Sequence, residues 1–205
     1  IFLCVKPQMM KDMLEGIADI LKRRETGSFV LVSMAAGLSM TKLLDVVQGD
    51  YPIIRIMPNT PVLLGKGMIQ YCHQNVNNTQ LSTWLKAMAL CGVLDEVSEK
   101  DMDAASSVSG CGPAFVYAFI EALADGGVAC GLPRQKAMTY AAQMVFGSAS
   151  MVLETGKHPG QLKDEVCSPG GSTIQGVRTL EEHGFRGAVM ASVIAAYEKT
   201  RDLGK

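Results

Sequence analysis

The apolar residues in the first half of the chain follow two alternating patterns. Short continuous apolar runs, typical of buried strands, stand between stretches in which apolar residues recur at helical spacing. The runs predict strands over residues 1–5, 29–33, 53–56, 68–71 and 92–97, and the periodic stretches predict helices over residues 8–24, 39–47 and 79–90. Such alternation indicates βαβ units around a mostly parallel sheet.

The pattern changes near Ser98, after which no stretch has the features of a strand. Helices are predicted over residues 99–108, 113–129, 134–155, 159–166, 173–183 and 186–203. Pro113 and Pro133 fall at helix starts, where proline is tolerated. The helix after Pro113 is apolar on nearly every side, which is typical of a helix buried in a core or in a subunit interface. We therefore predict two domains, an α/β part over residues 1–97 and an all-helical part over residues 98–205.

Composition and charge narrow the classes of partner. The chain has 205 residues, of which 48% are hydrophobic, so it is able to bury a sizeable core. Its formal net charge is −1 and it has no basic block, which argues against a nucleic-acid partner. No apolar run is expected to approach the roughly 18 residues that span a bilayer, so no membrane segment is predicted.

The cysteines and histidines form no recognisable metal or disulfide framework. The six cysteines are at positions 4, 72, 91, 111, 130 and 167, and the three histidines are at positions 73, 158 and 183. No cysteine pair has CxxC spacing, and the histidines do not complete a zinc pattern, so no metal is predicted. Free thiols in a reducing cytoplasm are the simplest interpretation.

The beginning of the chain has the features of the interior of a fold. Residues 1–5 are typical of a buried strand, with no initiator methionine and no signal peptide. No GxGxxG motif occurs, and the glycines around Gly65-Lys66-Gly67 precede a strand and not a helix. We therefore expect that an N-terminal segment, which would carry the phosphate end of any dinucleotide site, is missing.

Candidate ligand-binding residues follow the first three predicted strands. These segments are Lys6-Pro7, Met34-Ala35-Ala36-Gly37 and Met57-Pro58-Asn59-Thr60-Pro61. In an open parallel sheet, ligands bind outside the carboxyl ends of the strands, so the three segments are expected to meet at one edge. The small residues after the second strand would let a flat ligand lie against the backbone. The alternative is that these are ordinary loops, in which proline and glycine are common.

The loop Gly170-Gly171-Ser172-Thr173 precedes a helix with apolar residues at helical spacing. We expect Ser172 or Thr173 to cap this helix. The free amides of a helix start, together with the helix dipole, favour a carboxylate or phosphate. The alternative is a helix start after a tight turn, with no ligand.

Several carboxylates have two possible interpretations. Glu99 is either a first-turn residue favoured by the helix dipole or a contact for a cationic amine or imine. Glu121 and Asp125 lie one turn apart on an otherwise apolar helix, and helix capping or salt bridges at an interface are favoured for them over acid–base catalysis. Lys163, Asp164 and Glu165 precede the glycine loop, where they either rim the same pocket or form a solvated helix face.

Taken in order, eight segments resemble pyrroline-5-carboxylate reductase, and the resemblance covers essentially all 205 residues. They are Val5-Lys6-Pro7, Ala35-Ala36-Gly37, Met57-Pro58-Asn59-Thr60-Pro61, Ser109-Gly110-Cys111-Gly112-Pro113-Ala114-Phe115, Glu121-Ala122-Leu123-Ala124-Asp125, Gly131-Leu132-Pro133-Arg134, His158-Pro159-Gly160-Gln161-Leu162-Lys163-Asp164 and Ser168-Pro169-Gly170-Gly171-Ser172-Thr173-Ile174. Each segment by itself is weak evidence for the family, whereas the eight segments in this order are specific to it. The sequence departs mildly from the family pattern, with Cys111 where serine is usual, Phe115 where tyrosine is common and Ser172 where threonine or alanine is common.

The resemblance implies a fold, a reaction and an assembly. Residues 1–97 would be the C-terminal part of a dinucleotide-binding domain, an incomplete Rossmann-like parallel sheet. Residues 98–205 would be an all-α dimerisation and substrate-binding domain. The implied reaction is the reduction of 1-pyrroline-5-carboxylate to L-proline by NADPH or NADH, the last step of proline biosynthesis, in the cytoplasm. The implied assembly is a homodimer, with five dimers often forming a decamer.

The resemblance also implies roles for individual residues. Cofactor contacts would be Cys4, Val5, Lys6, Pro7, Met34, Ala35, Ala36 and Asn59, and substrate contacts would be Glu99, Glu165, Gly170, Gly171, Ser172 and Thr173. Glu165 stands at a variable position of the family. Glu99 would favour the protonated imine by its charge, and Thr173 would hydrogen-bond the ring nitrogen. Because an iminium needs only hydride, neither residue is expected to be an obligatory proton donor.

Two other functions are compatible with the sequence. The first is another imine or 2-hydroxyacid-type reductase with the same two-domain plan. The second is a truncated, catalytically inactive oligomerisation fragment of such a reductase, an interpretation that the absence of the dinucleotide turn favours.

Overall fold

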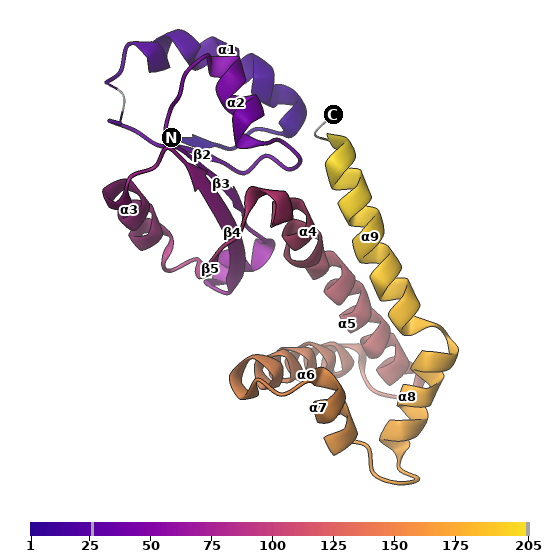
Figure 1. Ribbon diagram of the computed structural model, residues 1–205. Helices are drawn as coiled ribbons and strands as arrows, with labels where there is room; N and C mark the ends of the chain where they lie inside the picture. The colour runs from indigo at the N-terminus through magenta and orange to yellow at the C-terminus, as the bar shows by residue number, and fades with distance from the viewer. Residues whose placement is uncertain (26, 204–205) are drawn as a thin grey trace. The chain divides into compact units, whose positions relative to one another are not determined.

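The computed structural model describes residues 1–25 and 27–203, and it divides into two compact units. Unit 1 comprises residues Ile1–Pro113 and Val193–Lys205, and unit 2 comprises residues Ala114–Ser192. Figure 1 shows the strands gathered in the first part of the chain and helices throughout the second. The functional boundary predicted after residue 97 stays a prediction.

Unit 1 is built on a five-stranded sheet with the strand order β1-β2-β3-β4-β5. The strands are β1 (Phe2–Leu3), β2 (Leu31–Ser33), β3 (Ile53–Met57), β4 (Gly67–Gln74) and β5 (Gly92–Glu96). The pairs β1–β2, β2–β3 and β4–β5 are parallel, which confirms a mostly parallel sheet, whereas β3–β4 is antiparallel. Only a short 3-10 turn, η1 (Thr60–Leu64), joins β3 to β4, and so short a connection forces the chain to reverse because a parallel pair needs a long crossover.

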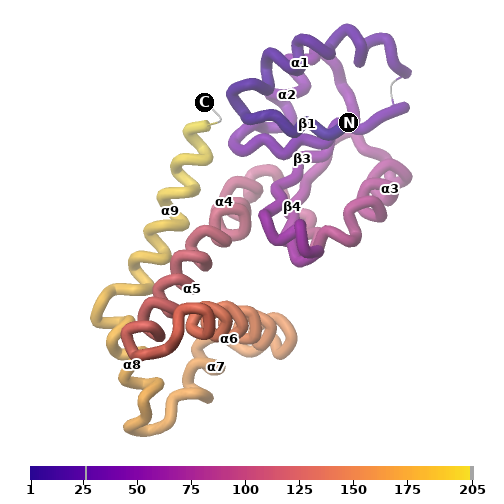
Figure 2. The backbone as a smooth tube through the Cα atoms, turned by 180° about the vertical axis from the view of Figure 1, so that it is seen from behind, coloured from indigo at the N-terminus to yellow at the C-terminus, as the bar shows by residue number. Residues whose placement is uncertain are grey.

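Helices cover both faces of this sheet, as the two opposite views show (Figures 1 and 2). The helices of unit 1 up to residue 109 are α1 (Pro7–Lys22), α2 (Met40–Val47), α3 (Asn78–Met88) and α4 (Glu99–Ser109). Residues of α1, α2 and α4, including Leu14, Leu43 and Met102, pack on one face, and Trp84 of α3 packs on the other. Ile53 and Met57 of β3 belong to the first of these clusters, and Ile54 and Ile56 belong to the second. The whole strand is buried, as expected for a strand covered on both sides.

Unit 2 contains helices and no strand among its described residues. Its helices are α5 (Gly112–Ala129), α6 (Arg134–Thr155), α7 (Pro159–Glu165), α8 (Ser172–Glu182) and the first part of α9 (Phe185–Leu203). These ranges confirm the predicted helices to within one residue. The buried centre of unit 2 is a small cluster of Ala124, Ala137 and Ala141, and a Cβ atom at Gly127 would lie 3.1 Å from that of Ala137. Small residues therefore let α5 and α6 pack closely.

The helical region α4–α5 corrects the prediction that no apolar run approaches the length of a membrane span. Residues Glu99–Ala129 contain one 18-residue window with a mean hydropathy of 1.3, long and apolar enough to cross a bilayer by length and composition. Only 11% of that window is buried in the chain. The window is not an uninterrupted apolar run, because polar residues such as Ser109 and Glu121 stand among its apolar residues. A helix at a subunit interface has the same composition.

Cys72 of β4 differs from the other thiols because it is buried in the core, whereas Cys4 is exposed. Burial, and to a smaller degree the charge of Glu99, raises the pKa of the Cys72 thiol from 9.0 to about 11. Since the thiolate is the nucleophilic form, both low access and a high pKa oppose its reaction.

We predict that iodoacetamide at about pH 8, near the ordinary thiol pKa, alkylates Cys4 of the native chain and leaves Cys72 unmodified. Peptide mass spectrometry measures the label at each site, and a denatured sample, in which both thiols react, is the control. Labelling of native Cys72 at the rate of Cys4 would contradict the burial described above.

Candidate functional site

The carboxyl ends of β1 and β2 lie side by side. The two strands are parallel, and Leu3 at the end of β1 pairs with Ser33 at the end of β2. The chain therefore leaves the sheet at neighbouring points into two of the segments predicted to bind the cofactor, Cys4–Pro7 and Met34–Ala36. The structure confirms the expected proximity of these two segments.

The loop after β2 is lined with small residues. Ala35 is 1% exposed and its N–H donates a hydrogen bond of 3.3 Å to the Ser33 hydroxyl, while Ala36 is half-buried. Gly37 has a φ angle of +75°, a conformation that suits glycine. Because no large side chain follows Met34 until Leu38, a flat ligand is able to approach this backbone closely.

The segment after β1 leads directly into α1. Lys6 is the exposed N-cap residue of this helix, and Pro7 is its first residue. The Lys6 side chain makes no capping hydrogen bond, and the first turn of α1 carries no acidic residue. The helix start and the Lys6 ammonium group together therefore present positive charge beside the small-residue loop.

Asn59 follows β3 at the same edge of the sheet, and its amide group is already engaged within the chain. Its side-chain oxygen accepts a hydrogen bond from the Met68 N–H, and its side-chain nitrogen donates to the Ser109 carbonyl, each over 3.0 Å. These bonds tie the turn after β3 to β4 and α4. The predicted contact between Asn59 and the cofactor stays a prediction, and the observed contacts are structural.

Glu99, the first residue of α4, makes contacts that the sequence did not suggest. Its Oε1 atom accepts a hydrogen bond of 2.7 Å from the N–H of Met40, the first residue of α2. The same oxygen lies 3.6 Å from a terminal nitrogen of Arg55. Glu99 thus links α4, α2 and β3.

Arg55 was missed as a functional candidate because it stands inside the apolar run of β3. Its side chain is 3% exposed, and its Nη2 atom lies 2.6 Å from the Asp103 carboxylate. An arginine in the middle of a buried strand indicates that a carboxylate lies nearby, since a buried charge needs a partner of opposite charge. Asp103 is that partner, together with Glu99.

In unit 2, the glycine loop begins α8 differently from the prediction. Gly171, and not Ser172 or Thr173, is the N-cap residue, and no side chain caps the helix. The prediction of a hydroxyl cap is therefore wrong, because Ser172 and Thr173 are already the first two helical residues. Both are exposed. Within the described residues, the Ser172 and Thr173 amides have no hydrogen-bond partner, as the expected anion cradle requires.

The glycines give this loop its shape. Gly170 has a φ angle of +70°, which suits glycine, and the Gly171 N–H donates a hydrogen bond of 3.0 Å to the Ser168 carbonyl. A Cβ atom at Gly171 would lie 2.4 Å from the Ser168 hydroxyl oxygen. The turn is therefore compact, and it brings the chain directly into α8.

Glu165, the last residue of α7, pairs with its neighbours. Its Oε1 accepts hydrogen bonds from the Lys157 ammonium group at 2.8 Å and from the Gln161 amide at 3.3 Å. The hydrogen bond from Lys157 lowers the pKa of Glu165. Glu165 lines a cavity of about 350 Å³ whose described lining does not include Gly170–Thr173.

Two of the remaining carboxylates that the sequence singled out, Asp125 and Asp164, form ion pairs. Lys163 pairs with Asp164 on α7, and Asp125 of α5 pairs with Arg134 at the start of α6. Asp125 therefore forms a salt bridge within the chain, whereas the expected salt bridge across a subunit interface stays a prediction.

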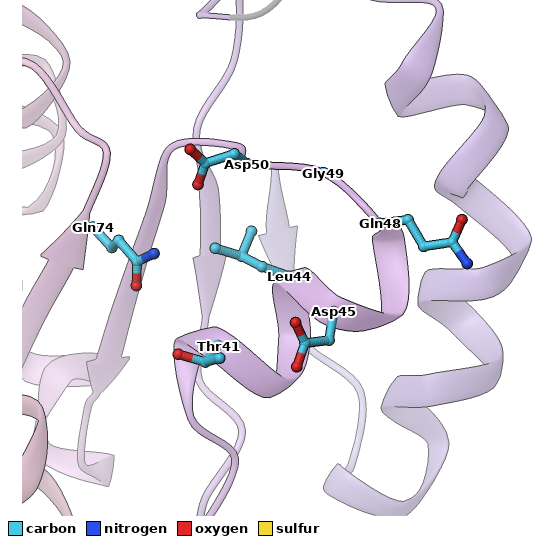
Figure 3. Close-up of a pocket in the computed structure, with 7 residues that line it drawn as sticks. All are labelled: Thr41, Leu44, Asp45, Gln48, Gly49, Asp50 and Gln74. Atoms are coloured by element: carbon cyan, nitrogen blue, oxygen red, sulfur yellow. The ribbon is translucent and has the colours of Figure 1, made fainter.

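A separate cavity lies at the opposite end of β3 (Figure 3). It has a volume of about 490 Å³ and is lined by Thr41, Leu44, Asp45, Gln48, Gly49, Asp50 and Gln74. It sits where α2 ends and β3 begins, and no residue predicted to bind cofactor or substrate lines it. Its two aspartates would repel an anionic ligand.

Comparison with known proteins agrees with the arrangement of strands and helices. A family model described as pyrroline-5-carboxylate reductase dimerisation matches residues 99–203. The chain is 44% identical over 206 residues to pyrroline-5-carboxylate reductase of Glycine max, covering 99% of this chain and 73% of that protein. It is 43% identical to the Escherichia coli K12 enzyme of the same name, covering 100% of this chain and 75% of that enzyme.

A solved structure is similar over the whole chain. The crystal structure of Plasmodium falciparum pyrroline carboxylate reductase with NADP bound has a TM-score of 0.93 and 40% sequence identity, covering 100% of this chain and 81% of that one. Identity at this level over nearly the full length goes beyond a shared fold. The chain belongs to the pyrroline-5-carboxylate reductase family of oxidoreductases.

Proposed function

We propose that this chain reduces 1-pyrroline-5-carboxylate to L-proline with NADPH or NADH, as the last step of proline biosynthesis in the cytoplasm. The observation that carries the proposal is the parallel pairing of β1 with β2, which brings Cys4–Pro7 beside Met34–Ala36. In open α/β sheets, ligands bind at such strand ends. The identity of the substrate is inferred from the family to which the chain belongs.

The residues at these strand ends fit a nicotinamide cofactor. Ala36 and Gly37 are partly exposed and have little or no side chain, so a flat ring would be able to approach their backbone, and Lys6 with the start of α1 favours an anionic group. When bound, the cofactor supplies hydride. The chain's own task is to hold it in reach of the imine carbon, because positioning is a large part of such catalysis.

The start of α8 in unit 2 fits the carboxylate of the substrate. The free amides of Ser172 and Thr173 would donate to it, with Gly170 and Gly171 shaping the turn. The Thr173 hydroxyl would hydrogen-bond the ring nitrogen. The substrate nitrogen enters protonated and keeps its proton, so hydride addition to the adjacent carbon completes the reaction without an obligatory proton donor. Glu165 and the charge of Glu99 are further predicted contacts.

An inactive oligomerisation fragment is the second candidate function. It is favoured by the many exposed apolar side chains of unit 2, together with a family model for dimerisation that matches residues 99–203. Among the exposed apolar residues are Val116, Tyr117, Leu123, Tyr140, Phe146, Leu180 and Val189. This candidate shares the assembly of the enzyme and differs from it in cofactor binding.

For either function, we propose that unit 2 forms a homodimer, which in the enzyme would assemble further into a decamer. An apolar groove of about 760 Å³ runs between α5 and the region of α8 and α9, with Phe119, Leu123 and Val189 in its lining. A second copy of this chain, which has the same apolar surface, would cover the groove.

Val189→Glu is expected to shift the chain from dimer to monomer. A carboxylate in a covered apolar groove would lose its water without gaining a partner, so we expect dimer affinity to fall by about 100-fold or more. Sedimentation velocity measures the change. The control is Ser82→Glu on the exposed face of α3, and a Val189→Glu chain that stays dimeric would contradict the proposed interface.

Ala36→Leu is expected to weaken NADPH binding by about ten-fold or more, since the larger side chain would occupy the place of the ring. Isothermal titration calorimetry measures the affinity. Ala89→Leu, at the exposed end of α3, is the matched control. A folded wild-type chain that gives no binding heat would favour the inactive fragment over the enzyme.

Thr173→Ala is expected to lower kcat/KM for 1-pyrroline-5-carboxylate by about 10- to 100-fold, because one hydrogen bond to a charged substrate is lost. Steady-state kinetics, with other cyclic imines as comparison substrates, measures the effect. Thr179→Ala on the same helix is the control, since its hydroxyl donates to the Gln175 carbonyl. Complete loss of turnover with unchanged substrate affinity would show that Thr173 is an obligatory proton donor.

A further inference from the structure

A buried cation fixes the position of two carboxylates on α4. Arg55 pairs in register with Ser33 of β2 and Cys72 of β4, so it lies in the middle of the sheet face that α1, α2 and α4 cover. Its terminal nitrogens lie 2.6 Å from Asp103 and 3.6 Å from Glu99. Because a buried guanidinium must stay paired, α4 is held to the sheet at this point.

Through Glu99, this pairing reaches the start of α2. The Met40 N–H is one of the amides that an α-helix leaves without an internal partner, and Glu99 accepts its hydrogen bond. Ser39, the N-cap residue, accepts a second amide of the same helix end, that of Lys42. The start of α2 is thus fixed once by its own N-cap and once by a carboxylate 59 residues further along the chain.

The segment held in this way is the loop proposed to receive the cofactor. Residues 34–39 run from the end of β2 to the start of α2. Near its beginning, the loop is held by the hydrogen bond from the Ala35 N–H to Ser33, and at its end by the bond from Met40 to Glu99. A loop fixed at both ends loses less conformational freedom when a ligand binds, and this raises affinity.

We propose that Glu99 is a positioning residue, which Arg55 holds in place and which keeps the Met34–Ala36 backbone in the conformation that binds the nicotinamide cofactor. The inference rests on the proposed function, because the cofactor is the ligand that the loop receives. It differs from the family-derived expectation that the charge of Glu99 acts on the substrate imine. The oxygen that accepts from Met40 is what matters for positioning, whereas the negative charge is what matters for the imine.

Two substitutions at Glu99 separate these roles. Glu99→Gln keeps an oxygen that is able to accept from Met40 and removes the charge, whereas Glu99→Ala removes both. Asp101→Asn is the matched control, because Asp101 lies in the same turn and its carboxylate accepts from the Ser98 hydroxyl. Ser39→Ala loosens the start of α2 by a different route and leaves Glu99 intact.

The first measurement is amide hydrogen exchange of Met40 in the full chain without ligand. We expect Glu99→Ala to speed exchange by on the order of ten-fold, and Glu99→Gln and Asp101→Asn to leave it within about two-fold of wild type. The second measurement is the NADPH dissociation constant by calorimetry. We expect Glu99→Ala and Ser39→Ala to raise it by on the order of ten-fold, and we expect Ser39→Ala, which leaves Glu99 in place, to keep the KM for 1-pyrroline-5-carboxylate unchanged.

Each result that would contradict an expectation has a distinct interpretation. A folded Glu99→Ala chain that binds NADPH as tightly as wild type would overturn the inference and leave the proposed function standing. Loss of turnover in Glu99→Gln with NADPH affinity intact would assign Glu99 to the substrate instead. If the Ala variant does not fold, Glu99→Gln and Ser39→Ala still decide between the roles. A wild-type chain without NADPH affinity would overturn the proposed function and the cofactor role of the loop together, and the exchange of Met40 would still test the structural link.

Discussion

The buried charge of Arg55 is the constraint on which the arrangement of unit 1 depends. A guanidinium in the central strand of a sheet covered on both faces is stable only beside carboxylates, and removing one partner from such a pair costs about 3–5 kcal/mol. Asp103 and Glu99 supply these carboxylates from successive turns of α4. The sheet therefore fixes α4, and α4 in turn fixes the start of α2. The end of the loop that leads into α2 is therefore held in place, through Glu99, by the charge of Arg55 in β3.

The two units offer two different kinds of binding surface. In unit 1, the strand ends combine small side chains with an uncapped helix start, which suits a flat, anionic cofactor. In unit 2, the start of α8 combines two glycines with two exposed hydroxyl residues, which suits a small carboxylate. In the proposed function, the first amides of α8 would bind the substrate carboxylate. At α1, Pro7 has no N–H and the Met9 N–H donates to the Lys6 carbonyl, so the Lys6 ammonium group and the helix dipole would supply the positive charge there.

The periodicity of the sequence predicted the elements well and their directions less completely. Apolar runs located every strand of unit 1, and the helical ranges agree with the structure to within one residue from Ser98 onward. The reversal at β4 was not predicted, because it depends on how the short segment after Met57 turns and not on any apolar pattern. That turn is fastened by Asn59, whose side chain bonds residues distant in sequence.

The candidate site was predictable in its location and less so in its internal contacts. Strand ends and the glycine loop were found from residue types alone. The contact of Glu99 with Met40 was not predictable, because it joins residues of separate elements. Arg55 was counted as part of an apolar run, although its charge was the clearest sign of a buried partner. The cap of α8 was predicted wrongly because a glycine at the N-cap leaves the hydroxyl residues inside the helix.

The apolar character of α5 has two physical explanations, and its charged residues favour one of them. A bilayer would have to accommodate Glu121 and Asp125, whose burial in hydrocarbon is unfavourable. Asp125 and its partner Arg134 are both more than half exposed, as suits an ion pair at the rim of a protein interface. The exposed apolar side chains also extend over α6, α8 and α9, so they form a surface shared by several helices and not a single apolar span. A second copy of the chain is the partner that such a surface fits, and the dimerisation model matched by residues 99–203 agrees with it.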